Sequence, residues 1–184
     1  LGKSGIEWLQ NPDGSQGYAW NFYSGCLNRK TNICSIPNCW AKGITERFKN
    51  HYPNGFEPTL YPEAFESPLH LKKPSRIGVC FMGELFGDWM TDEVVASDGD
   101  YWDMKMVRTI VTSVIEACPQ HTFIFLTKQP QNLAKWSPYP PNVYLGVTVT
   151  NQEMFDKAIY YLRMVDAKVK FLSFEPLLEL IKVV

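Results

Sequence analysis

Short apolar segments alternate with amphipathic ones along most of the chain. Segments 76–82, 122–126, 143–149 and 168–174 are rich in β-branched and aromatic residues, and Gly, Pro or polar residues bound them. Apolar segments of this length are typical of strands buried on both faces of a parallel sheet. The segment 18–23 predicts one more short strand, just ahead of a region rich in cysteine.

Between these strands, apolar residues recur with the three- to four-residue spacing of helices. This spacing predicts helices over 40–48, 104–118 and 155–162. Five prolines within 52–75 predict a connecting segment with at most one short helix. The alternation of strand and helix predicts an α/β fold, a single domain over 1–184 whose parallel sheet is either open or rolled into a barrel.

Polar residues gather where the predicted strands end. Because the carboxyl ends of parallel strands face the active site in barrels and open sheets, these residues are candidates for a binding pocket. They are Gly83, Glu84, Thr127, Lys128, Thr148, Thr150, Asn151, Ser173 and Glu175. No side chain among them is singled out as catalytic.

Charge and composition narrow the function classes. The net charge is −1, so no basic field indicates binding to nucleic acid or to an anionic membrane. No apolar run reaches the roughly 18 residues of a membrane helix, and the N-terminus lacks a signal-peptide pattern, so we expect a cytoplasmic protein. The chain starts without Met and ends on an apolar run, so we also expect the natural protein to continue beyond Val184.

Three of the five cysteines, Cys26, Cys34 and Cys39, share the spacing C-x7-C-x4-C. In a reducing compartment this grouping indicates metal binding, and thiolates suit either zinc or an iron–sulfur cluster. Structural zinc needs a fourth ligand, and neither His51 nor Cys80 gives the paired spacing of a zinc finger. A [4Fe–4S] cluster on three cysteines leaves one iron open. That iron can chelate S-adenosylmethionine (SAM), from which one electron yields a 5′-deoxyadenosyl radical.

The other cysteines and the acidic segment are expected to be structural. Cys80 lies in a predicted strand and Cys118 on an apolar helix face, so both are predicted to pack as small core residues. The acidic residues between Asp88 and Asp103 are predicted to start a helix and to lie on a solvated surface.

A set of short segments spread over nearly the whole chain carries a resemblance. They are Ile6-Glu-Trp8, Gly25-Cys26, Cys34, Cys39-Trp-Ala41, 118–123, Leu126-Thr-Lys128, Leu145-Gly-Val147, Asn151-Gln152 and 171–178. In these segments the chain resembles a phage-associated family of uncharacterised three-cysteine proteins with radical-SAM-like features. The function of that family is not established, so this resemblance adds little about mechanism.

Similarity to the wider radical-SAM superfamily rests on fewer positions. Gly83-Glu84 resembles the glycine–glutamate motif that holds the amino group of SAM. The superfamily usually has C-x3-C-x2-C with an aromatic residue before the last cysteine, whereas here both intervals are longer and Trp40 follows Cys39.

The resemblance implies a partial (β/α) barrel of radical-SAM type, incomplete at its C-terminus. In such a barrel Cys26, Cys34 and Cys39 would be the iron ligands, and Glu84 would bind the SAM amino group. Thr148, Asn151, Ser173 and Glu175 would line the adenosyl and substrate pocket.

Three functions remain open from the sequence. One is a radical SAM enzyme that needs a flavodoxin- or ferredoxin-like reductant and acts on an unknown substrate. Phage association allows nucleic acid or a nucleotide as that substrate, although the net charge does not support it. Another is a non-catalytic, zinc-stabilised phage adaptor or binding protein, which would unfold on loss of the metal. The third is a relative that keeps the fold and binds no metal.

Overall fold

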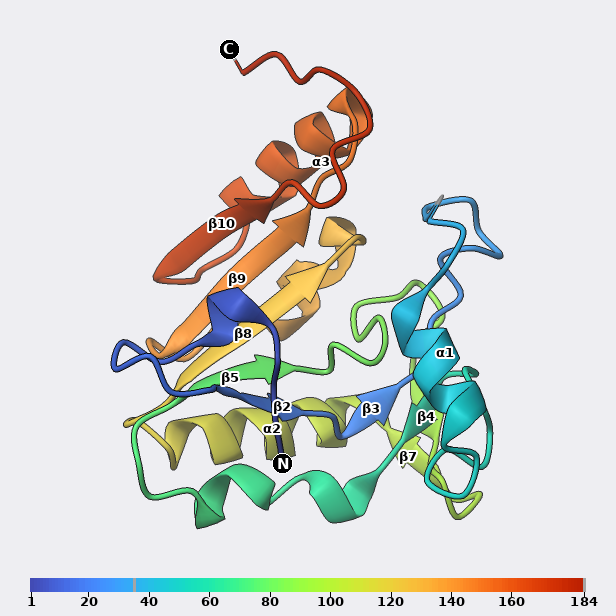
Figure 1. Ribbon diagram of the computed structural model, residues 1–184, viewed down its shortest axis with the longest axis vertical. Helices are drawn as coiled ribbons and strands as arrows, with labels where there is room; N and C mark the ends of the chain where they lie inside the picture. Colours follow the sequence, from blue (N-terminus) through green and yellow to red (C-terminus); the bar gives the residue numbers. More distant parts are fainter. Residues whose placement is uncertain (35, 184) are drawn as a thin grey trace.

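The computed structural model, which describes residues 1–34 and 36–183, confirms an α/β fold (Figure 1). Five parallel strands lie side by side in chain order, namely β2 (Tyr18–Trp20), β5 (Arg76–Val79), β8 (Thr122–Thr127), β9 (Val143–Thr148) and β10 (Val169–Ser173). Strand β1 (Gly2–Lys3) pairs with β2 in the antiparallel direction. A doubly wound sheet reverses its strand order at one point. This sheet does not, so it is singly wound.

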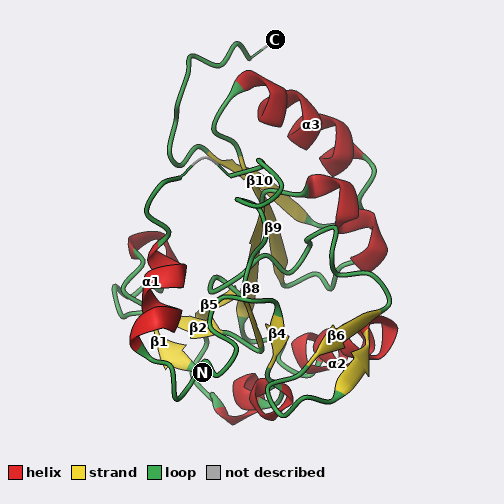
Figure 2. Ribbon diagram, turned by 90° about the vertical axis from the view of Figure 1, so that its right-hand side faces the viewer, coloured by secondary structure: helices red, strands yellow, loops and turns green. Residues whose placement is uncertain are grey.

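The α-helices lie on both sides of the sheet. They are α1 (Trp40–Arg47), α2 (Met104–Glu116) and α3 (Gln152–Arg163), and short 3-10 helices span Glu7–Leu9, Pro62–Ala64, Ser67–His70 and Pro130–Trp136. Figure 2 shows α2 and α3 against one face of the sheet and α1 on the opposite side. Across the part of the chain that the structure describes, no helix combines the length and the apolarity needed to cross a membrane.

The face covered by α2 and α3 holds the main apolar core. Val107 and Val111 of α2 and Phe123 and Phe125 of β8 belong to one cluster, and each is at most 1% exposed. Helix α2 begins at Asp103, whose side chain accepts a 2.9 Å hydrogen bond from the main-chain N–H of Met106. The helix-initiating role predicted for the acidic segment is therefore confirmed at Asp103.

Four segments depart from the sequence predictions. The segment 52–75, expected to hold at most one short helix, contains a short strand and two 3-10 helices, Pro62–Ala64 and Ser67–His70. The strand predicted over 18–23 is split, because its second part, β3 (Tyr23–Ser24), pairs with β4 (Thr59–Leu60) outside the main sheet. The strand predicted over 76–82 ends at Val79, since Cys80 adopts a φ of +56° and starts a turn. The acidic segment also contains a hairpin of β6 (Glu93–Val95) and β7 (Tyr101–Asp103).

Candidate functional site

A cavity of about 690 Å³ opens at the carboxyl edge of the sheet, between the strand ends and the cysteine-containing loop 26–39. It brings together most of the residues selected from the sequence, namely Cys26, Cys34, Cys39, Gly83, Glu84, Thr127, Lys128, Thr148, Ser173 and Glu175. Thr150 is not among its lining residues, and its hydroxyl donates to Met154 Sδ over 3.1 Å. Asn151 is not among them either. Its side chain instead accepts a 2.9 Å hydrogen bond from Met154 N–H and caps α3.

Two glycines let the start of the loop approach the end of β5. Gly25 N–H donates to Met82 O over 3.1 Å, and Glu84 N–H donates to Gly25 O over 3.0 Å. Gly25 has a φ of +93°, and a Cβ there would lie 2.3 Å from Glu57 O. A Cβ on Gly83 would lie 2.5 Å from Gly25 O. This close backbone contact places Cys26 next to Glu84 at the cavity.

The main chain of Asn28 organises the first half of the loop. Its N–H donates to Cys26 Sγ over 3.4 Å, and its carbonyl accepts from the N–H groups of Ile33 over 2.8 Å and of Cys34 over 3.1 Å. Asn28 is only 2% exposed. The loop is therefore wrapped around one buried residue, which contacts the backbone or sulfur of two of the three cysteines.

The carboxylate of Glu84 is the polar centre on the sheet side of the cavity, and it is 4% exposed. Oε1 accepts hydrogen bonds from Thr127 Oγ1 over 2.6 Å and from Phe86 N–H over 3.2 Å. Oε2 accepts from Lys128 N–H over 2.9 Å and from Asn28 Nδ2 over 3.2 Å. Burial raises the pKa of this carboxyl, and the hydrogen bonds from Thr127, Lys128 and Phe86 oppose the rise.

A buried amide extends this network behind the cavity. Gln129 is fully buried, and its Nε2 donates to Asn28 Oδ1 over 2.7 Å. Its main-chain N–H donates to Thr127 Oγ1 over 2.8 Å. Sequence reasoning missed both Asn28 and Gln129. The rule that selected Lys128 from the end of a buried strand would also have reached Gln129, but no motif marks Asn28.

The three loop thiols are free and partly buried, and they line the same cavity. Burial, with smaller contributions from the nearby Glu84, Cys34 and Cys39, raises the pKa of Cys26 to about 12, and the hydrogen bond from Asn28 N–H opposes the rise. Cys39 precedes α1 as its N-cap residue. Among residues 1–34 and 36–183, no three His, Cys, Asp or Glu side chains form a group that could hold a single metal ion.

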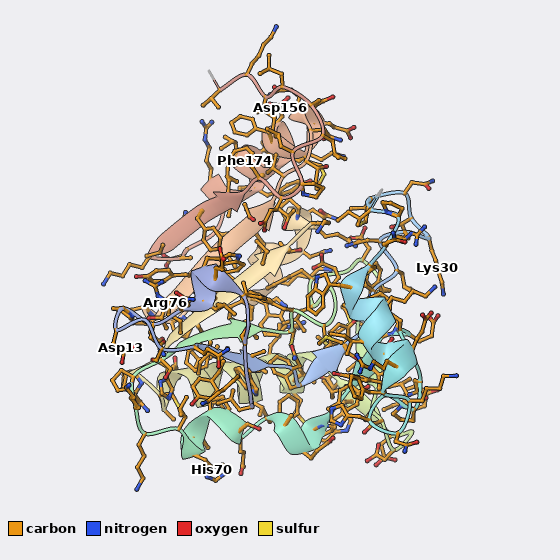
Figure 3. The ribbon with its side chains drawn as sticks, in the orientation of Figure 1. Asp13, Lys30, His70, Arg76, Asp156 and Phe174 are labelled. Atoms are coloured by element: carbon orange, nitrogen blue, oxygen red, sulfur yellow. The ribbon has the colours of Figure 1, made fainter. Side chains whose placement is uncertain are left out.

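Other side chains close the cavity and set its outer limits. Trp40 lines the cavity and is nevertheless 56% exposed, so one indole ring lies between the cavity and solvent. In Figure 3 the nearby Lys30 points outward from the loop, where its Nζ forms an exposed 2.8 Å ion pair with Glu57. The two core cysteines lie elsewhere, since Cys80 and Cys118 are 2% and 1% exposed in the apolar cluster, as predicted.

These features define a singly wound α/β protein with a cysteine-lined cavity at the carboxyl edge of its sheet. The chain belongs to the family described as Protein of unknown function (DUF5131), whose model matches residues 3–184. Searches with this chain found no match among the curated proteins or the solved structures.

Proposed function

We propose that the protein is an iron–sulfur enzyme of radical-SAM type. Cys26, Cys34 and Cys39 hold a [4Fe–4S] cluster, and SAM binds in the cavity beside it. The observation that carries this proposal is the convergence of three thiols and the Glu84 carboxylate on one cavity. The five parallel strands in chain order are compatible with a partial (β/α) barrel, in which ligands bind at the carboxyl ends of the strands.

The donor set fits a cluster better than a single zinc ion. Zinc holds its thiolates at about 2.3 Å, so they must converge on one point. A [4Fe–4S] cluster binds each cysteine through a different iron, so the thiols surround a larger volume. The three loop thiols line one cavity. Three thiols suit a cluster with one open iron better than a structural zinc site, which needs four ligands.

Cluster and SAM together supply reductive cleavage of the sulfonium, which gives methionine and a 5′-deoxyadenosyl radical that takes a hydrogen atom from substrate. The electron comes from a flavodoxin- or ferredoxin-like reductant. The residues of the chain would bind and orient the cluster, SAM and the substrate. Thr148, Ser173 and Glu175 line the side of the cavity formed by β9 and β10, where they would meet the adenosyl group and substrate.

In this proposal Glu84 receives the amino group of SAM. Its four acceptor positions already have donors, so an ammonium group would have to share an oxygen with one of the two longer bonds. Those bonds are the 3.2 Å contacts from Phe86 N–H and Asn28 Nδ2. Asn151 has no part in the pocket, because its side chain caps α3.

Anaerobic purification followed by metal analysis and an optical spectrum tests the proposal. We expect a brown protein with about four irons per chain that loses visible absorbance on reduction with dithionite. Addition of SAM to the reduced protein should release 5′-deoxyadenosine. A colourless protein with one zinc would overturn the proposal in favour of the zinc-stabilised adaptor, and a metal-free folded protein would leave only the scaffold.

A further inference from the structure

A buried hydrogen bond joins the cysteine loop to the carboxylate on the sheet side of the cavity. Asn28 Nδ2 donates to Glu84 Oε2 over 3.2 Å, between residues 56 positions apart in the chain. The other end of the same amide is also used, since Oδ1 accepts from Gln129 Nε2 over 2.7 Å. Both residues are less than 5% exposed, so water does not replace these partners.

The backbone of the same residue contacts two of the three loop cysteines. Asn28 N–H contacts Cys26 Sγ, and the Asn28 carbonyl holds the amides of Ile33 and Cys34. One residue thus holds the loop through its main chain and the strand ends through its side chain. A displacement of Glu84 therefore changes the position of the loop, and a displacement of the loop changes Glu84.

We propose that Asn28 is a positioning residue that couples the cysteine loop to Glu84. In metal-free protein it keeps the loop folded against the strand ends. In loaded protein it makes cluster retention and SAM binding depend on each other, and this second part rests on the proposed function. The coupling is reciprocal, because any free energy that links two sites acts in both directions.

Reversal of the hydrogen-bond polarity tests the contact itself. Asn28→Asp keeps an acceptor for Gln129 but places an acceptor against the Glu84 carboxylate. Glu84→Gln alone keeps an acceptor for Asn28. The double variant Asn28→Asp/Glu84→Gln restores a donor–acceptor pair in the opposite direction, so it should recover part of what Asn28→Asp loses.

The first readout needs no metal. Hydrogen exchange measures the protection of the Ile33 and Cys34 amides, which donate to Asn28 O. In the metal-free protein we expect Asn28→Asp to lower this protection about ten- to hundredfold, as for a lost buried hydrogen bond to a charged group. The double variant should regain part of it. Unchanged protection in Asn28→Asp, or no recovery in the double variant, would overturn the proposal.

Asn132→Asp is the matched control. Asn132 is also a buried amide that donates to a carboxylate, with Nδ2 2.8 Å from Asp88 Oδ1, but it lies outside the loop. We expect Asn132→Asp to lower the free energy of unfolding of the whole chain. The exchange protection of the Ile33 and Cys34 amides should then fall no more than that of the amides in α2 and α3. An equal loss of loop protection in both variants would mean general destabilisation and would contradict coupling through Asn28.

The second readout uses reconstituted protein. We expect Asn28→Asp to lower both the iron retained per chain and the affinity for SAM measured by titration. A SAM affinity that rises in Asn28→Ala would show that Asn28 competes with ligand for Glu84, and it would overturn the positioning role. Failure of the wild-type protein to bind iron would refute the proposed function alone, because the metal-free exchange result does not depend on it.

Discussion

The core face of the sheet and its carboxyl edge contrast in what their buried residues do. On the face covered by α2 and α3, apolar side chains such as Val107 and Phe123 fill a closed core. At the carboxyl edge, beside the cysteine loop, the chain leaves a cavity of about 690 Å³. Buried polar groups such as Asn28, Glu84 and Gln129 hold the backbone there. The core face stabilises the fold, and the carboxyl edge organises a site.

Cysteine illustrates the contrast within one residue type. Cys118 packs as a small apolar residue in the core, whereas Cys26 lines the cavity and receives a hydrogen bond from Asn28 N–H. A cysteine in the apolar core is therefore structural, whereas a cysteine that lines the cavity is a candidate ligand.

The largest expected effect separates these two kinds of cysteine. Cys34→Ala should reduce the iron content from about four per chain to less than about one and abolish release of 5′-deoxyadenosine, because it removes one of three cluster ligands. Cys118→Ala should keep the cluster and lower the free energy of unfolding by about 1 kcal/mol. Iron and sulfide analysis after anaerobic purification checks both. Equal iron in Cys34→Ala and wild type would remove the loop from the proposed site.

The next effect concerns the reactivity of Cys26 after the metal is removed by chelation. Its pKa of about 12, against 9.0 for an ordinary thiol, lowers the thiolate fraction at pH 8, so alkylation should be about a thousandfold slower than in urea-unfolded protein. The rate should rise about tenfold per pH unit until the pH approaches the pKa.

The pKa of Cys26 in the folded protein lies above its ordinary value of 9.0. Burial therefore favours the thiol form in the folded state, and stability should fall as the pH rises from 9 towards 12. Peptide mapping by mass spectrometry after iodoacetamide treatment measures the reactivity. Equal rates in the folded and unfolded chains would show that the thiol is not desolvated.

A comparison of two glycines should give a smaller effect. Gly25 and Gly99 have nearly equal φ values of +93° and +96°, but only at Gly25 would a Cβ meet backbone atoms. Gly25→Ala should therefore lower the free energy of unfolding by about 2–4 kcal/mol, from backbone strain and overlap together. Gly99→Ala should lose only about 1–2 kcal/mol from strain. Urea unfolding measures both, and equal losses would show that the loop can move away from Glu57.

The smallest effect tests Asn151, a predicted pocket residue that does not line the cavity. Asn151→Ala should lower the free energy of unfolding by about 1 kcal/mol through loss of the α3 cap, and should leave SAM affinity unchanged. Thermal unfolding and a SAM titration measure the two quantities. Weaker SAM binding without loss of stability would return Asn151 to the pocket.

The fold was predictable because strands and helices have different apolar periods. The strand predicted over 122–126 and the helix predicted over 155–162 agree closely with β8 and α3. The break at Cys80 was not predictable, since its φ of +56° depends on the turn that brings Gly83 to Gly25. The conformational preferences of neighbouring residues do not reveal such a long-range contact.

The site was predictable only in part, for a related reason. Strand ends share an edge, so Glu84, Thr148 and Ser173 could be grouped from the sequence and do line one cavity. Asn28 was missed because nothing in its neighbourhood marks it. Its role arises from partners such as Glu84 and Gln129 that are distant in the chain. Asn151 was selected by the same strand-end rule, but a helix begins there and takes its side chain.

The position of Trp40 gives the molecule an internal optical reporter. Its ring belongs to the cavity wall and also meets bulk water. Occupation of the cavity would remove water from one side of the indole, and a bound iron–sulfur cluster would quench its fluorescence. Because the chain has six tryptophans and Trp8 lines the same cavity, the difference in emission between wild type and Trp40→Phe would isolate this signal and follow the filling of the cavity without an added label.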